Sequence, residues 1–278
     1  MPARWCKIPA AGIFTLQHCC FLFYLQGIVT TSLQPPYQIF SLGDSAVTID
    51  YGNTISETLN EKVLNIQQWL HTHHFEGLKD IVTAYSSVTL VYDPFIVRKS
   101  NPVHGTVAEW VTALLQKAAA QAGEQFTAGE RVVRIPVCYE GIYAPDLEEL
   151  AVRSALTMAE VIRLHNERVY RVYMIGFLPG FSYMGEVDLR IAVARKQQAV
   201  PVMAGSVGIA GIQTGIYPLN SPGGWHIIGR TPVKMFDRMN KVPARLQAGD
   251  HVQFYAISPA AFEEEQLKNS ITGNGLMS

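Results

Sequence analysis

The sequence predicts an α+β protein with two domains, and three features of the 278-residue chain carry this prediction. Helix-like and strand-like segments alternate in the first half, as in proteins that pack helices on one sheet. The second half has many short strand-like segments separated by glycine and proline, which favours a closed barrel or a sandwich. The stretch GEQFTAGE between the halves is the expected boundary, with a small α+β domain at 35–128 and a β-rich domain at 129–278.

The first half is expected to hold two strands, a helix, two strands and a second helix. Short strands are predicted within 37–52, and a helix follows from Ser56, whose hydroxyl suits an N-cap. Two further strands are predicted within 78–93, and a second amphipathic helix within 102–122. One face of the first helix is expected to be buried because its apolar residues recur every three or four positions: Leu59, Val63, Ile66 and Leu70.

The second half begins with a predicted strand at 131–139 and two short helices. The first helix starts near Pro145, and Thr157 with Glu160 forms a capping box for the second. A helix is also expected from Phe262 onward. Further strands are predicted at 170–176, 225–229, 233–236 and 251–257.

Composition and charge restrict the classes of partner. The net charge is −1, which gives no electrostatic basis for binding nucleic acid or an anionic membrane. The two short helices meet at a tight turn as in DNA-binding proteins, but Glu160 and Glu167 accompany Arg163 and Arg168 on the second helix. We therefore expect a small-molecule substrate, no nucleic-acid partner and no membrane association.

Cysteine usage indicates a reducing compartment. Only Cys138 lies outside the first twenty residues, and one thiol cannot form a disulfide framework, so we expect a cytoplasmic protein. Within an apolar strand, that thiol is more often inert than nucleophilic. Residues 1–34 are expected to be an extension outside the fold; a secretory leader is the alternative, although Gln17 and His18 interrupt its apolar run.

Two groups of histidines are candidates for chemical sites. His71, His73 and His74 lie close together, but residues two apart do not share a helical face, so we expect no metal site. His165 shares an apolar helical face with Met158 and Ile162. A buried histidine with satisfied ring nitrogens and a catalytic histidine are both open interpretations.

The stretch from Tyr173 to Pro232 is the most informative part of the chain. It holds ten of the 22 glycines, yet it contains no P-loop, no dinucleotide-binding glycine motif and no nucleophile elbow. Dense glycine suggests turns whose main-chain groups line a ligand site, and tight corners of a β-domain are the equal alternative. The polar and aromatic candidates in this stretch are Gln213, Thr214, Tyr217, Ser221, Trp225 and Arg230.

Several motifs occur in a specific order and resemble one family over about residues 39–257. They are IPVCY, PDLEEL, RLH, YRVYMIGFLPGFSYMG, AGSVGIAG, QTGIYPLNSPGGW and IIGRTP. In this order they resemble the family of the 5-oxoprolinase B subunit, which also includes allophanate hydrolase subunit 1 and the histidine-kinase inhibitor KipI. The resemblance implies that the β-rich domain is a cyclophilin-like β-barrel.

The resemblance also implies an activity and partners. The B subunit works with the C and A subunits of 5-oxoprolinase in the ATP-dependent opening of 5-oxoproline to L-glutamate, and ATP, with Mg²⁺, is the co-substrate of the complex. ATP is needed because a lactam that has not been activated resists hydrolysis. Hydrogen-bond donors held at fixed positions then stabilise the charge that develops. The alternative is a KipI-type regulator that binds and inhibits a histidine kinase; peptidyl-prolyl isomerase activity, by analogy of fold, ranks last.

The family motifs imply site residues at matching positions. His165 and Arg230 are the implied catalytic residues. The implied substrate- or nucleotide-binding residues are Gly176, Phe177, Pro179, Gly180, Phe181, Ser206, Gln213, Thr214, Gly215, Ser221, Pro222, Gly223, Gly224 and Trp225. The chain departs from the family pattern at 182–185, which reads SYMG, and at 194–196, which reads ARK in place of Pro-Arg-Arg. The second departure alters the loop that leads into the barrel.

Overall fold

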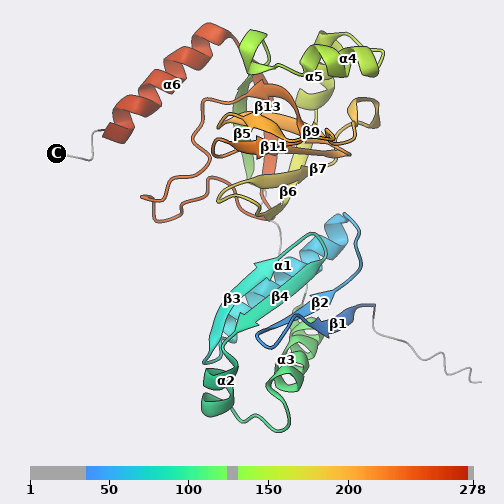
Figure 1. Ribbon diagram of the computed structural model, residues 1–278, viewed down its shortest axis with the longest axis vertical. Coiled ribbons are helices and arrows are strands. Elements are labelled where there is room, and N and C mark those ends of the chain that lie inside the picture. Colours follow the sequence, from blue (N-terminus) through green and yellow to red (C-terminus); the bar gives the residue numbers. More distant parts are fainter. Residues whose placement is uncertain (1–35, 124–130, 275–278) are drawn as a thin grey trace, which may run out of the picture. The chain divides into compact units, whose positions relative to one another are not determined.

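The computed structural model describes residues 36–123 and 131–274, and Figure 1 shows their elements. These residues form a four-stranded sheet with helices and a closed barrel of seven strands, which confirms the predicted α+β class with a barrel. The expected extension at 1–34 lies outside the described residues, and so does the expected domain boundary except for Gly123. The division into domains at 128 therefore stays a prediction.

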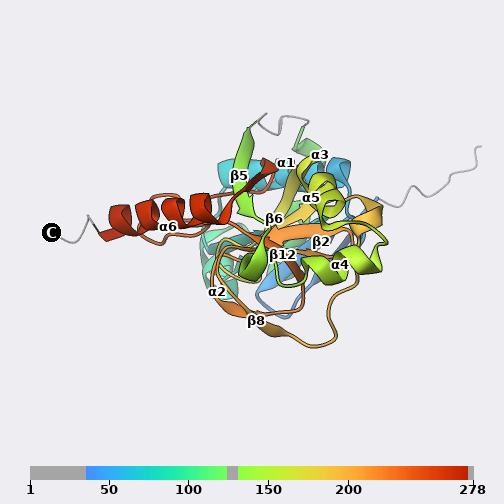
Figure 2. The same ribbon diagram turned by 90° about the horizontal axis from the view of Figure 1, so that it is seen from above.

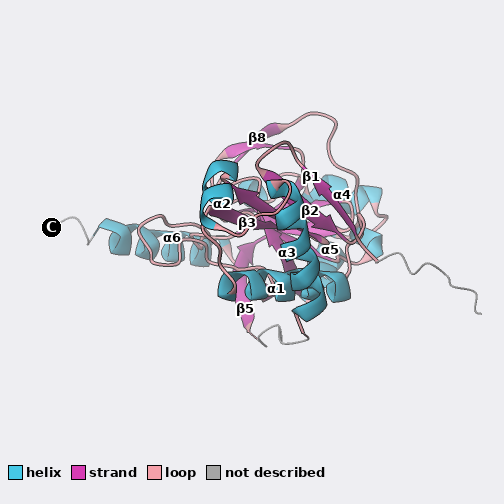
Figure 3. Ribbon diagram, turned by 90° about the horizontal axis from the view of Figure 1, so that it is seen from below, coloured by secondary structure: helices cyan, strands magenta, loops and turns pink. Residues whose placement is uncertain are grey.

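The four-stranded sheet is antiparallel, in the order β1-β2-β4-β3. Two helices, α1 and α3, pack against each other and against its strands, and Figure 3 shows them together. Of the predicted helical face, Val63, Ile66 and Leu70 are buried; Leu59 is half-buried. The bounds are β1 Gln38–Ser41, β2 Ala46–Asp50, α1 Glu57–Thr72, β3 Leu78–Thr83, β4 Ser87–Tyr92 and α3 Val107–Gln121.

One helix of this part was not expected from the sequence. Asp93 was interpreted as the end of a strand, but its carboxylate also accepts from the backbone N–H groups of Phe95 and Ile96, at 3.1 Å each. It thereby caps α2 (Pro94–Ser100), with proline at the first helical position. The helix predicted at 102–122 begins later, at Val107, because Thr106 and Glu109 form its capping box.

The barrel closes in the order β10-β7-β6-β13-β5-β12-β9, with β9 paired back to β10. Its pairings are antiparallel except that of β13 with β5, which are parallel over seven residue pairs from His251↔Val132 to Ile257↔Cys138. The bounds are β5 Val132–Cys138, β6 Val169–Ile175, β7 Ser182–Gly185, β9 Ser206–Ala210, β10 Gln213–Ile216, β12 His226–Arg230 and β13 His251–Ile257.

Apolar side chains fill the barrel interior, among them Val137, Val172, Met184 and Ile228. Two helices pack against each other and beside the barrel, α4 (Leu147–Arg153) on β12 and α5 (Met158–Asn166) on β13 (Figure 1). The capping box predicted for the second helix is present. The residues of α5 that this packing buries are Val161, Leu164 and His165, whereas Met158, expected on the same face as His165, is exposed.

Some elements of the second half differ from the prediction. Residues 233–236 form no strand; Phe236 makes only an isolated bridge with Ala244. The last helix, α6 (Pro259–Asn274), begins three residues earlier than expected and contacts β5. A two-stranded ribbon of β8 (Val200–Val202) and β11 (Ser221–Gly223) lies outside the barrel ladder, and Figure 2 shows β8 at its periphery.

Short 3₁₀ helices at Gly141–Tyr143 and Leu189–Ile191 complete the described elements. Within residues 36–123 and 131–274, no helix is both long enough and apolar enough to cross a membrane.

Candidate functional site

Five aromatic rings form a cluster on the outer face of the barrel. Phe181, at 1% exposure, is its centre, with ring centroids 4.7 Å from Tyr183, 5.0 Å from Tyr217 and 5.4 Å from Trp225. Phe177 adds the fifth ring, 5.7 Å from Phe181. Most of these pairs have steep angles between the rings, as in edge-to-face packing. We call these five residues the aromatic cluster.

Glycines in the predicted binding motifs make room for these rings. A methyl group at Gly215 would lie 3.0 Å from ring atoms of Phe181 and Trp225, and a methyl group at Gly223 would collide with the Tyr217 ring. Both positions accept only a residue without Cβ, because such distances are shorter than van der Waals contact. These glycines therefore have a packing role that is sufficient to explain them.

The turn between β6 and β7 supports the exposed edge of the aromatic cluster. Its backbone is closed by a bond from the Gly176 N–H to the Phe181 carbonyl at 3.1 Å. Gly180 has φ of +84°, and a side chain there would meet Phe236 at 2.9 Å. Phe177 also has a positive φ, of 70°, and its side chain is 64% exposed, whereas Pro179 is exposed at the tip of the turn. This turn thus presents an aromatic side chain to solvent.

Tyrosines extend the row of aromatic rings from the barrel to the four-stranded sheet. The ring of Tyr85, between β3 and β4, lies 6.0 Å from that of Tyr183 and 6.1 Å from that of Tyr173. Its hydroxyl accepts from the Gln213 side chain at 2.8 Å. Burial raises the pKa of Tyr85 to about 12, so this hydroxyl is neutral at physiological pH. The side chain of Gln213, a predicted binding residue, is therefore already hydrogen-bonded within the protein.

His165, in α5, is buried against the barrel, and both of its ring nitrogens are occupied. Nδ1 is 2.9 Å from the Tyr139 hydroxyl, and Nε2 is 2.9 Å from the hydroxyl of Thr214. The imidazole is fully buried and stacks on Phe254, with ring centroids 4.6 Å apart. Burial lowers the pKa of His165 to about 3. This geometry favours the interpretation as a satisfied core histidine; its predicted catalytic role, like that of Thr214 in binding, stays a prediction.

Arg230 is also held within the fold. Its Nε donates to the Ala204 carbonyl at 2.8 Å, and its guanidinium lies 5.7 Å from the ring centre of Phe262 in α6. Ser206 is its ladder partner on β9 and is buried. The Ser221 hydroxyl is buried without a hydrogen-bond partner in the described part of the chain. Arg230 and His165, the two predicted catalytic residues, thus have no hydrogen-bond partner in common.

The segment that departs from the family pattern contains two adjacent cations with different surroundings. Lys196 Nζ contacts both carboxylate oxygens of Asp146, at 2.8 and 2.7 Å. Arg195 is exposed beside Gly224 and forms no ion pair with any residue in 36–123 or 131–274. Arg195 was not among the site residues predicted from the sequence.

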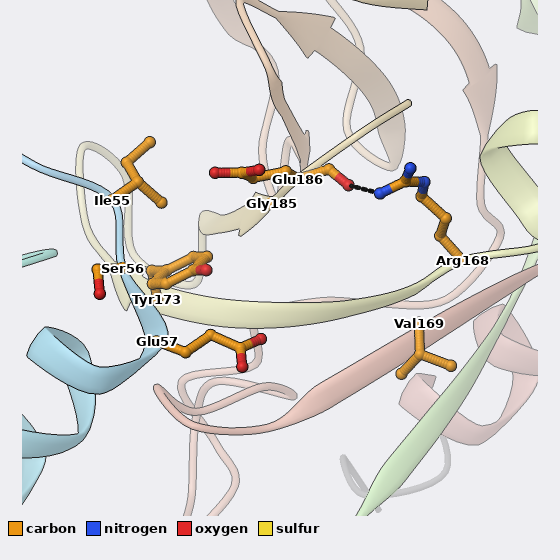
Figure 4. Close-up of a pocket in the computed structure, with 8 residues that line it drawn as sticks. All are labelled: Ile55, Ser56, Glu57, Arg168, Val169, Tyr173, Gly185 and Glu186. Atoms are coloured by element: carbon orange, nitrogen blue, oxygen red, sulfur yellow. Dashed lines mark hydrogen bonds between the residues drawn. The ribbon is translucent and has the colours of Figure 1, made fainter. Parts of the chain in front are cut away.

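A separate cavity of about 370 Å³ opens near the start of α1 (Figure 4). Arg168 donates to the Glu186 carbonyl at 3.2 Å across one side of it. Burial, with the carboxylates of Glu57 and Glu186 adding, raises the pKa of Tyr173 to about 12. None of the predicted site residues lines this cavity; its walls are Ile55, Ser56, Glu57, Arg168, Val169, Tyr173, Gly185 and Glu186.

The remaining candidates from the sequence are the histidines at 71, 73 and 74 and the thiol of Cys138. His73 stacks on Trp69 with ring centroids 3.8 Å apart. No group of three or more His, Cys, Asp or Glu side chains suited to a metal ion occurs within the described ranges. The Cys138 thiol is buried, and burial raises its pKa.

The structure brings together part of the predicted site. The turn 176–181 and the glycines and tryptophan around it form one face. The other predicted residues lie elsewhere, in three places: His165 pairs with Thr214, Gln213 bonds to Tyr85, and Arg230 lies beside Ser206. Sequence reasoning missed Tyr183 and Arg195. Their only signal was membership of the two segments that depart from the family pattern.

Residues 37–246 match the family described as carboxyltransferase domain, subdomain C and D, and the chain belongs to this family. It is 42% identical over 234 residues to the 5-oxoprolinase B subunit of Bacillus subtilis (strain 168), covering 82% of this chain and 98% of that protein. This similarity confirms the resemblance indicated by the motifs. A protein of the same name from Haemophilus influenzae is 46% identical over 45% of this chain and 59% of its own length.

Solved structures share the fold. TTHA0988 has a TM-score of 0.65 and 34% identity over 77% of this chain, which spans 40% of that longer protein. The urea amidolyase of Kluyveromyces lactis has a TM-score of 0.66 at 16% identity, covering 82% of this chain and 15% of its own length. The latter likeness concerns the fold alone.

Proposed function

We propose that this chain is the B component of a multi-subunit 5-oxoprolinase, which opens the lactam ring of 5-oxoproline to give L-glutamate with consumption of ATP. The observation that carries the proposal is the 42% identity to the Bacillus subtilis 5-oxoprolinase B subunit over 98% of that protein. Two more proteins of this name, from Haemophilus influenzae and Escherichia coli O157:H7, match over 45% and 48% of the chain.

We infer that the active site is shared with the C subunit of 5-oxoprolinase, with the A subunit as a further partner. The outer face of the barrel offers an aromatic wall, and beside it Arg195 has no ion-pair partner among the described residues. His165 and Arg230 already make hydrogen bonds within the fold. Lactam hydrolysis also needs a positioned water and groups that transfer protons, and we assign these to the partner proteins. The isolated chain is therefore expected to be inactive.

ATP binding is assigned to the assembled complex. A triphosphate with Mg²⁺ requires several cations or carboxylates in one place. Near the aromatic cluster, Lys196 is neutralised by Asp146, and Arg195 has no ion-pair partner among the described residues. By themselves these residues do not fit a nucleotide site.

Reconstitution tests the proposal. The full chain is mixed with the cognate C and A proteins, and L-glutamate formed from 5-oxoproline is measured with and without ATP. Glutamate is expected only when all three proteins and ATP are present. Mixtures that omit each protein in turn are the controls. A complete mixture that forms no glutamate, or one whose rate does not change when this chain is left out, would contradict the proposal.

A further inference from the structure

Residues 194–196 are fixed to the barrel on both sides of Arg195. The Ala194 carbonyl accepts from Nε2 of buried His226 at 3.1 Å. On the other side, the Lys196 N–H donates to the Gly224 carbonyl at 2.8 Å. The Lys196 ammonium is itself anchored by Asp146. The main chain at Arg195 is thus held in one place, and the guanidinium extends from a fixed point.

The guanidinium lies along the edge of the aromatic cluster. A methyl group at Gly224 would stand 3.8 and 3.9 Å from its Nε and Nη2 atoms. Burial raises the pKa of the Tyr183 and Tyr217 hydroxyls, and the nearby charge of Arg195 opposes this rise at both. The Tyr217 hydroxyl already accepts from the backbone N–H of Trp225, whereas Tyr183 is only half-buried. An oxyanion beside Gly224 would therefore meet the guanidinium of Arg195, next to Trp225 of the aromatic cluster.

The two adjacent cations, Arg195 and Lys196, have different surroundings. Both oxygens of Asp146 neutralise the lysine, and that carboxylate also accepts from the Ile227 N–H at 2.6 Å. No acidic side chain in 36–123 or 131–274 pairs with Arg195. A guanidinium presents parallel N–H donors that match the two oxygens of a carboxylate. The absence of a side chain at Gly224 keeps the space beside these donors open.

We propose that Arg195 binds the carboxylate of the small lactam substrate at the edge of the aromatic cluster. The inference rests on the proposed function, since it assigns the substrate's carboxylate to a place on the same face. The lactam ring then lies toward the aromatic cluster, and its carbonyl is directed to the partner proteins. Arg195 is a binding residue in this arrangement.

Kinetics of the complete three-protein complex test this assignment. Arg195→Met is compared with wild type on 5-oxoproline and on 2-pyrrolidinone, the same lactam without its carboxylate. Loss of a charged, forked contact is expected to raise the KM for 5-oxoproline about tenfold to hundredfold. The KM for ATP and the rate on 2-pyrrolidinone are expected to stay within about twofold of wild type. The KM of Arg195→Lys for 5-oxoproline should lie between those of wild type and Arg195→Met, because lysine retains the charge without the parallel N–H donors of a guanidinium.

Arg190→Met is the matched control, because Arg190 is exposed and its guanidinium is bound to Asp188 at 2.9 Å. It should leave both KM values unchanged. An unchanged KM for 5-oxoproline in Arg195→Met would overturn the proposal. So would a selective rise in the KM for ATP, which would place a phosphate at this arginine. Circular dichroism of each variant verifies that it is folded.

A binding measurement separates failure of this inference from failure of the proposed function. If the wild-type mixture makes no glutamate, the proposed function fails, and titration calorimetry on the full chain with its partners still decides the site. Tighter binding of 5-oxoproline than of 2-pyrrolidinone, lost in Arg195→Met and kept in Arg190→Met, would support a carboxylate site. No such preference in wild type, or a preference that survives in Arg195→Met, would overturn it.

Discussion

Asn60 in α1 accepts a hydrogen bond of 3.2 Å from the guanidinium of Arg171 in β6, 111 positions later in the chain, and both side chains are buried. The amide of Asn60 also donates to the Tyr85 carbonyl at 3.3 Å and to the Tyr173 carbonyl at 3.0 Å. Glu61 lies 3.8 Å from the same arginine. A single asparagine thus satisfies groups on the four-stranded sheet and on the barrel.

Replacing this asparagine should be costly. Asn60→Ala removes a hydrogen-bond partner from two carbonyls and from a buried guanidinium, and we expect a loss of about 2–3 kcal/mol in the free energy of unfolding. Urea denaturation measures it. Gln68→Ala, at an exposed position of the same helix, is the control and should change stability by less than about 0.5 kcal/mol. Equal values for the two variants would show that the buried bonds contribute nothing.

Gly215 and Gly176 should respond differently to the same substitution. A methyl group at Gly215 would lie 2.9 Å from the Ser182 carbonyl oxygen and 3.0 Å from two aromatic rings, whereas at Gly176 it would meet only the flexible end of Met174. We expect Gly215→Ala to destabilise the protein by about 1–3 kcal/mol through overpacking, and Gly176→Ala by clearly less. Thermal unfolding of both variants provides the comparison. A Gly215→Ala variant as stable as wild type would contradict this packing role.

The ion pair of Asp146 with Lys196 should contribute more than an exposed pair. These side chains are 13% and 20% exposed, and Asp146 also binds the Ile227 N–H. Asp146→Ala leaves a largely buried ammonium and an amide unpaired, with an expected cost of about 2–3 kcal/mol. In Glu167→Ala the lost partner, Arg163, is 53% exposed, and the expected cost is below about 0.5 kcal/mol. Urea unfolding curves of both variants decide; a cost for Asp146→Ala as small as that for Glu167→Ala would refute the prediction.

His165 should make stability depend on pH below about 6.5. Burial lowers its pKa in the folded protein to about 3, from an ordinary value of 6.5. Between these values the unfolded chain binds a proton that the folded protein does not, so stability falls as pH falls, by at most about 1.4 kcal/mol per pH unit. Above pH 6.5 this histidine contributes no pH dependence.

The substitution His165→Gln removes that contribution, so its effect should itself vary with pH. The stability advantage of wild type over the variant should shrink by about 2 kcal/mol between pH 7.5 and pH 5.0. Urea denaturation of both proteins at the two pH values measures this difference. A constant advantage would show that the imidazole takes up its proton as readily in the folded protein as in the unfolded chain.

Local signals in the sequence were sufficient for many elements. The Thr157–Glu160 capping box and the apolar face of α1 are properties of neighbouring residues, and both were predicted. The segment 233–236 has strand-like residues but no neighbouring strand with which to form a ladder. Helix α2 was missed because Asp93 follows a strand and caps a helix at once. Its second role depends on the residues after it.

The candidate site was less predictable, because its properties depend on contacts between distant residues. Glycine content indicated a stretch built for shape, but only the fold shows that Gly215 lies against Phe181 and Trp225. Arg195 and Lys196 look equivalent in the sequence. They differ because Asp146, 50 positions earlier, neutralises only the lysine.

The place of β13 in the barrel has a consequence for synthesis on the ribosome. This strand lies between β6 and β5 and pairs with both, yet it is the last strand of the described chain to be translated. Until residue 257 has emerged, a nascent chain presents two unpaired strand edges, on β5 and β6. Such edges readily pair with other chains. Ribosome-bound chains that end before His251 therefore need protection from aggregation. This need ends when β13 has emerged and paired with β5 and β6.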